Sequence, residues 1–151
     1  MYVRVEHSRV LVARVESAHP LSYVLPVGER LPLHLGGAGK LFLADMAPDE
    51  RGAALGDIVN VRLADGTTLT RDEFDAQLEQ INAAGYAFSV SERLVGIASV
   101  TAPVRAGDGS LQAVLGVTGP SDSINDDTRA GLVAEVRRAA DAFGARIPLQ
   151  R

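Results

Sequence analysis

The sequence predicts an α+β fold, in which helices pack on a mainly antiparallel sheet. Three observations support this class. Short runs of β-branched residues occur as adjacent pairs near both ends of the chain, helical spacing is confined to the middle and the C-terminus, and strands do not alternate with helices. The 151 residues suffice for one domain with its own core. We therefore expect a single domain over residues 1–151.

Each element follows from a local pattern. The predicted strands cover residues 2–6, 9–15, 22–25, 86–91, 97–104 and 111–118. The predicted helices cover residues 37–45, a short segment from Pro48, 71–84 and 126–143. Thr70 and Glu73 have the spacing of a capping box, and Gly85 suits the end of that helix. Residues 56–69 show no clean period and are expected to form loops.

Composition excludes several classes of function. The formal net charge is −4 and the pI is about 5.3, so the chain lacks the basic surplus that a DNA-binding domain uses against phosphates. It has no cysteine, which excludes disulfides, thiolate metal sites and thiol catalysis. We see no signal segment and no apolar run approaching about 18 residues. These features predict a soluble cytoplasmic protein without a membrane partner.

The run Gly36-Gly37-Ala38-Gly39-Lys40 resembles a phosphate-binding loop only superficially. His34 stands where a Walker A motif needs glycine, and Leu41 stands where it needs serine or threonine. A glycine-rich entry to a helix nevertheless exposes backbone N–H groups, and the helix dipole favours a small anion in front of them. The other interpretation is a tight turn that lets the helix pack closely on the sheet.

No catalytic or metal-binding set is apparent. The three histidines lack a metal-ligand spacing, and no nucleophile motif of the Gly-x-Ser-x-Gly kind is present. His34 could contact a ligand or simply hydrogen-bond the backbone. Glu92 and Arg93 are interpreted as a solvated loop, and a group of aspartates near residue 126 as a loop and a helix cap. We expect no enzyme activity, no metal and no cofactor.

Small polar residues interrupt the two most apolar strands. Alternation places Ile97, Ser99 and Thr101 on one face of the first strand, and Gly116 and Thr118 on one face of the second. Such positions leave room for a ligand and hydrogen-bond it, or they form ordinary cross-strand pairs. Both interpretations remain open from the residues alone.

Several blocks together resemble the effector-binding domain of IclR-type transcriptional regulators. The blocks are RVES at 14–17, LPLHLGGAGKLFLA at 31–44, GYAF at 85–88, Gly96, VTAPV at 100–104 and GVTGPSDSI at 116–124. Their order and spacing match across nearly the whole chain. The resemblance implies a GAF-like fold that binds a small metabolite and assembles as dimers or tetramers. It also implies an N-terminal winged helix-turn-helix, absent from this sequence, through which DNA is bound.

The resemblance also implies a set of pocket residues. Gly37 and Ala38 match the N–H donors for an effector carboxylate, and Ile97 matches an apolar wall. The remaining matches are Ser89, Ser99, Gly116 and Thr118. Relatives often carry an acid at the position of Ser89, and some carry serine at that of Gly116. Their loss predicts a less polar, roomier pocket and a larger, partly apolar acid, such as an aromatic one, as effector.

The function predicted is therefore allosteric control of transcription by a small carboxylate. The alternatives are a stand-alone GAF-like ligand-binding domain without a DNA-binding role, an enzyme using the same pocket, and an oligomerisation module with a filled pocket. The reading frame upstream, turnover of a bound ligand and stabilisation by metabolites distinguish them.

Overall fold

The computed structural model describes residues 1–18 and 25–148, which form an antiparallel six-stranded sheet with helices on both faces. The strands are β1 (Tyr2–Val5), β2 (Ser8–Leu11), β3 (Arg30–Pro32), β6 (Ala87–Val90), β7 (Ile97–Arg105) and β8 (Leu111–Pro120), in the order β3-β2-β1-β8-β7-β6. The helices are α1 (Gly37–Asp45), α2 (Pro48–Leu55), α3 (Arg71–Ala84) and α4 (Asp126–Gly144). This architecture confirms the predicted α+β, GAF-like class.

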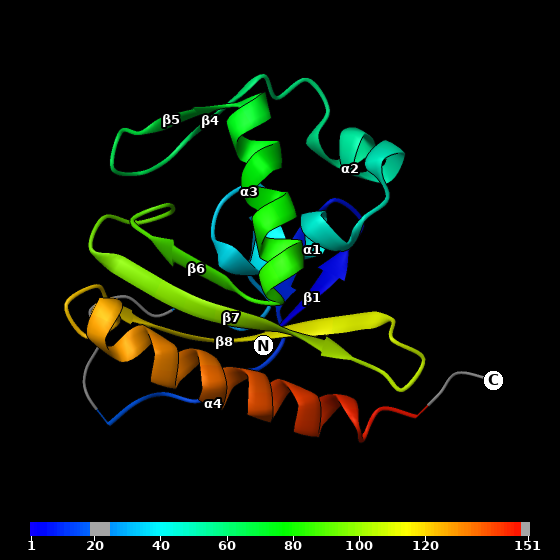
Figure 1. Ribbon diagram of the computed structural model, residues 1–151, viewed down its shortest axis with the longest axis vertical. Coiled ribbons are helices and arrows are strands. Elements are labelled where there is room, and N and C mark those ends of the chain that lie inside the picture. The colour runs from blue at the N-terminus through cyan, green and yellow to red at the C-terminus, as the bar shows by residue number, and fades with distance from the viewer. Residues whose placement is uncertain (19–24, 149–151) are drawn as a thin grey trace.

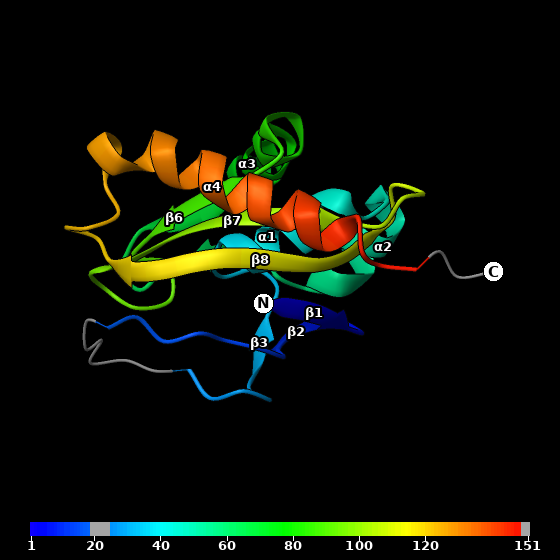
Figure 2. The ribbon, with the colours of Figure 1, turned by 90° about the horizontal axis from the view of Figure 1, so that it is seen from below.

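The sheet separates two helical layers. Helix α4 runs along β7 and β8 on one face, while α1 packs on the other face and α3 packs over α1 (Figures 1 and 2). Each layer has its own apolar core: Val100, Ala140 and their neighbours lie under α4, and Leu43, Phe74 and Leu78 lie around α1 and α3. The long β7–β8 hairpin is central, because it contributes to both cores.

Local signals account for most boundaries. The Thr70 hydroxyl accepts from the Glu73 N–H while the Glu73 carboxylate accepts from the Thr70 N–H, so the predicted capping box starts α3. Gly85 ends α3 with a left-handed φ of 73°. The predicted bounds of α1 and α3 agree with the structure.

Two expectations need correction, and one strand was missed. The strand predicted over 9–15 ends at Leu11, because residues 12–18 lie exposed and belong to no strand pair among the described residues. The N–H groups of Val12 and Ala13 donate only to the Met1 carbonyl, next to the start of β1. Residues 60–62 and 68–70 form a small hairpin, β4 (Asn60–Arg62) and β5 (Thr68–Thr70), where only loops were expected. Strand β3 was not predicted. The predicted strand over 22–25 falls mostly outside the described residues.

Within residues 1–18 and 25–148, none of the helices combines the length and the apolar character needed to cross a membrane.

Candidate functional site

Helix α1 begins directly against the sheet, and glycine permits this approach. A Cβ on Gly37 would lie 2.8 Å from the Thr101 Oγ1 and 3.3 Å from the Ala87 Cβ, so a larger residue would push the helix away. Gly36, the N-cap residue, has a φ of 85°, which L side chains rarely adopt. The glycine run therefore makes both the tight turn and the close packing that the second interpretation expected.

The first amides of α1 are only partly used by the protein itself. The Gly36 N–H donates to the Glu92 Oε2 at 2.8 Å, and the Lys40 N–H donates to the Gly36 carbonyl at 3.2 Å. No described residue accepts a hydrogen bond from the amides of Gly37 or Ala38. The amide of Gly39 likewise donates to no described residue, so the positive end of the helix retains three donors at buried positions.

The sheet beside these amides carries a row of hydroxyl groups. The register places Ser89 opposite Ser99 and Ser99 opposite Thr118, so their side chains share one face of the sheet. The Ser89 and Ser99 Oγ atoms lie 2.7 Å apart and hydrogen-bond each other. Ser89 is buried, Ser99 is half-buried and Thr118 is exposed, so the row runs from the core to the surface.

The neighbouring rows place the other predicted site residues on that face. Thr101 pairs with Ala87 and with Gly116, directly under the start of α1, and Ile97 pairs with Pro120 at the far end. Alternation therefore brings the five predicted strand positions (Ser89, Ile97, Ser99, Gly116 and Thr118) to the face on which α1 packs.

The expectation of extra room at Gly116 is wrong in this structure. A Cβ on Gly116 would stand 2.6 Å from the Thr101 Cγ2 and 3.0 Å from the Val100 carbonyl oxygen. The Thr101 methyl thus fills the space that a side chain at position 116 would take. The sequence suggested that the space beside Gly116 was open to a ligand, because the strand register that brings Thr101 next to it could not be predicted.

Sequence reasoning also missed a buried ion pair at the start of α1. The Lys40 ammonium donates to Oε1 of Glu92 and, at 3.2 Å, to Oε1 of Gln77. Glu92 is only 8% exposed, so interpreting it as part of a solvated loop was wrong. The available signal was Lys40 itself, a charge within a run of apolar residues that the helix buries on every side.

Arg9, from β2, also lies at the start of α1, beside the N-cap residue Gly36. Its Nη1 donates to the carbonyl oxygens of Pro32 at 2.6 Å and Leu35 at 2.5 Å, and so fixes the segment that leads into α1. The guanidinium carbon lies 5.4 Å from the centre of the Tyr2 ring. Burial lowers the Arg9 pKa to about 10, which still leaves the guanidinium charged at neutral pH.

His34 does not share a cavity with the hydroxyl row. It lines a separate open cavity of about 430 Å³ between β3 and α2, together with Arg30, Leu55 and Ile58. Burial lowers the His34 pKa below 6.5, and the charge of Arg9 lowers it further. The imidazole is therefore neutral at pH 7.

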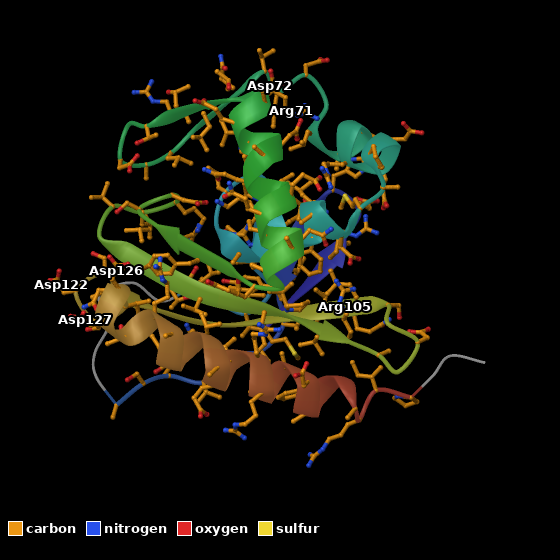
Figure 3. All side chains as sticks on the ribbon, viewed as in Figure 1. Arg71, Asp72, Arg105, Asp122, Asp126 and Asp127 are labelled. Carbon is orange, nitrogen blue, oxygen red and sulfur yellow. The ribbon has the colours of Figure 1, made fainter. Side chains whose placement is uncertain are left out.

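The aspartates of the last helix form a surface feature. Asp122, Asp126 and Asp127 lie exposed at the start of α4, where Asn125 is the N-cap residue (Figure 3). Asp126 and Asp127 occupy the first turn, as the helix dipole favours. The interpretation of this group as exposed to solvent holds, whereas the cap itself is Asn125 and not an aspartate.

Comparison with known proteins identifies relatives of the whole domain. The family model for the bacterial transcriptional regulator IclR C-terminal domain matches residues 1–145. The HTH-type transcriptional repressor AllR of Escherichia coli K12 is 30% identical over 130 residues, and AllR of Salmonella typhimurium is 29% identical over 128. Each alignment covers 83% of this chain but only 46% of the repressor, so this chain spans about half the length of those relatives.

Solved structures share the fold. A transcriptional-regulator structure from Rhodococcus sp. RHA1 superposes with a TM-score of 0.86 at 26% identity, covering 95% of this chain and 58% of that one. The PobR inducer-binding domain of Acinetobacter, a double mutant in complex with 3-hydroxybenzoic acid, superposes with a TM-score of 0.82 at 22% identity. That match covers 97% of this chain and 86% of the PobR domain. The matched family and its named relatives are transcriptional regulators and not enzymes.

Proposed function

Because the chain belongs to the IclR family of bacterial transcriptional regulators and corresponds to their C-terminal domain, we propose that it binds a small carboxylate effector at the start of α1. The observation that carries this proposal is the pair of buried amides, of Gly37 and Ala38, that no described residue accepts from. Amides at a helix N-terminus are well suited to a carboxylate.

The hydroxyl row favours a ligand that carries polar atoms besides its carboxylate. Ser89, Ser99 and Thr118 lie on the α1 face of the sheet, and hydroxyl groups both donate and accept hydrogen bonds. Ile97, half-buried one row further on, offers apolar contact. A carboxylate joined to an apolar or aromatic body fits this order of groups, as does the bound 3-hydroxybenzoic acid of the PobR domain, which shares the fold.

Control of DNA binding is the regulatory half of the proposal. The whole regulator carries a DNA-binding part and assembles from two or four copies, and the effector binds one arrangement of subunits more tightly than the other. Only this difference in affinity shifts the population between them. With the −4 charge of this chain, phosphate contacts come from the DNA-binding part.

Isothermal titration calorimetry of the 151-residue chain tests ligand binding, with 3-hydroxybenzoate, benzoate and pyruvate as probes. We expect benzoates to bind more tightly than pyruvate. Ala38→Pro removes the Ala38 amide from the first helical turn, where proline is tolerated, and lowers affinity at least tenfold. Asp72→Pro makes the same change at the matching position of α3 and leaves affinity unchanged.

Two results would contradict the proposal. If none of these acids bound, no effector site of this chemistry would exist at α1. If Ala38→Pro folded, as judged by circular dichroism, and bound as well as the unmodified chain, the carboxylate would lie elsewhere. Tighter binding of pyruvate than of benzoates would leave the carboxylate site standing and overturn the aromatic effector.

A further inference from the structure

The buried charges of this domain do not balance. Among the residues the structure describes, only three charged side chains are buried, namely Arg9, Lys40 and Glu92. They are 3%, 4% and 8% exposed, and all three surround the start of α1. Two cations and one anion leave a surplus of one positive charge in a desolvated place.

Both carboxylate oxygens of Glu92 already accept hydrogen bonds within the protein. One carboxylate oxygen accepts from the Lys40 ammonium, and the other accepts from the Gly36 amide. The pair is therefore neutral and anchored to the N-cap of α1. Arg9 remains without a carboxylate partner in the described part of the chain, and the charges of Arg93 and Glu92 act on it at longer range in opposite directions.

Arg9 also retains hydrogen-bond donors. Its Nη1 makes both of the bonds to carbonyl oxygens, whereas the buried Nε has no acceptor among the described residues. The Nη2 likewise donates to none of them, and it lies 3.0 Å from the point where a Cβ on Gly36 would stand. The guanidinium thus places an uncompensated charge beside the first turn of α1. Two carbonyl dipoles and the Tyr2 ring offset only part of the cost of burying it.

We propose that Arg9 makes the effector site selective for a monoanion. The negative charge of the bound effector then compensates the positive charge of Arg9. This inference rests on the proposed carboxylate site and adds its charge specificity. Arg9 acts through the field it imposes on the first turn of α1. A neutral molecule of the same shape leaves the surplus charge uncompensated and so binds weakly.

The test uses acetate as the anionic probe and acetamide as its neutral counterpart. Acetate replaces chloride at constant ionic strength, and nitrogen–proton correlation spectra follow the amides of Gly37 and Ala38 and the Nε–H of Arg9. We expect all three signals to shift with acetate and to stay in place with acetamide. These measurements use the unmodified chain, so they do not depend on whether a variant folds.

Three variants separate the charge of Arg9 from its structural role. Arg9→Gln removes the charge and weakens acetate binding about tenfold. Arg9→Lys keeps the charge but loses the geometry that bonds the carbonyl oxygens of Pro32 and Leu35. Its affinity for acetate stays within about threefold of that of the unmodified chain. Arg4→Gln is the matched control, because Arg4 pairs with Arg9 across β1 and β2 yet is exposed and bonded to Glu50. It leaves the affinity unchanged.

Failure of this inference differs from failure of the proposed function. If acetate moved the Gly37 and Ala38 amides but not the Arg9 Nε–H, Arg9 would have no role and the carboxylate site would stand. Equal weakening by Arg9→Lys and Arg9→Gln would assign Arg9 a structural role only. If neither acetate nor benzoate moved the two amides, the site at α1 itself would be wrong.

Discussion

The face of the sheet under α4 and the face under α1 bury different kinds of residue. Under α4 the core consists of alanine, valine and isoleucine side chains, with no buried charge among the described residues. The α1 face holds an apolar core as well, but it also holds Arg9, Lys40, Glu92 and the hydroxyl row. A buried charge, or a buried amide without a hydrogen-bond acceptor, lowers the stability of the fold unless a partner compensates it.

This contrast separates a supporting face from a binding face. The apolar α4 layer can stabilise the β7–β8 hairpin without reference to a ligand. The α1 layer places polar groups from four separate segments around one helix start, which is an arrangement that stability alone does not require.

Breaking the buried ion pair should have the largest effect on stability. Glu92→Ala leaves the Lys40 ammonium buried without its carboxylate and should lower the free energy of unfolding by about 3–5 kcal/mol. Glu135→Ala breaks an exposed pair with Arg138 on α4 and should cost below about 1 kcal/mol. Urea denaturation measures both. Equal losses for the two variants would show that the buried pair at α1 contributes no more to stability than an exposed one.

Truncating the apolar face should cost stability but not binding. Val100 is fully buried under α4, so Val100→Ala should lower the free energy of unfolding by about 2 kcal/mol. Acetate affinity should stay as in the unmodified chain, because the change lies across the sheet from α1. Calorimetry with urea denaturation checks both parts. A loss of affinity matching that of Arg9→Gln would contradict the division between faces.

Adding a methyl group should have opposite signs in the two layers. Gly131→Ala lies in an exposed part of α4 with open space around it and should stabilise the fold by up to about 1 kcal/mol. Gly37→Ala meets the Thr101 Oγ1 and should destabilise it by about 1–3 kcal/mol. Thermal unfolding compares the two. Stabilisation by Gly37→Ala would mean that α1 does not need its close approach to β7.

The smallest effect should be a pH dependence from His34. Its folded pKa lies below the unfolded value of 6.5, so the unfolded chain takes up a proton first as the pH falls. Stability is therefore full above pH 6.5 and declines as the pH drops below it. The difference in melting temperature between pH 7 and pH 5.5 should shrink in His34→Gln. An unchanged difference would assign the decline to other groups.

Local patterns in the chain were enough to predict the class of fold and most of its elements. Hydrophobic spacing, the capping box at Thr70 and the left-handed glycine at 85 act within a few residues, so α1 and α3 could be predicted to their ends. Alternation along β7 and β8 likewise assigned the hydroxyl residues to faces before any strand was paired. Short strands such as β3 and the β4–β5 hairpin carry too few residues for a period to be visible.

The groups around the start of α1 come from segments that are far apart in the sequence, so local patterns could not predict them. Glu92 and Lys40 are 52 residues apart, and Arg9 meets the carbonyls of residues 32 and 35 through strand pairing and packing. Nothing local marks Glu92 as buried, because a charged residue after a strand is exposed in most sequences. The filled space at Gly116 depends in the same way on Thr101 of the neighbouring strand. Burial and charge balance are sums over distant neighbours, and these exist only once the chain has folded.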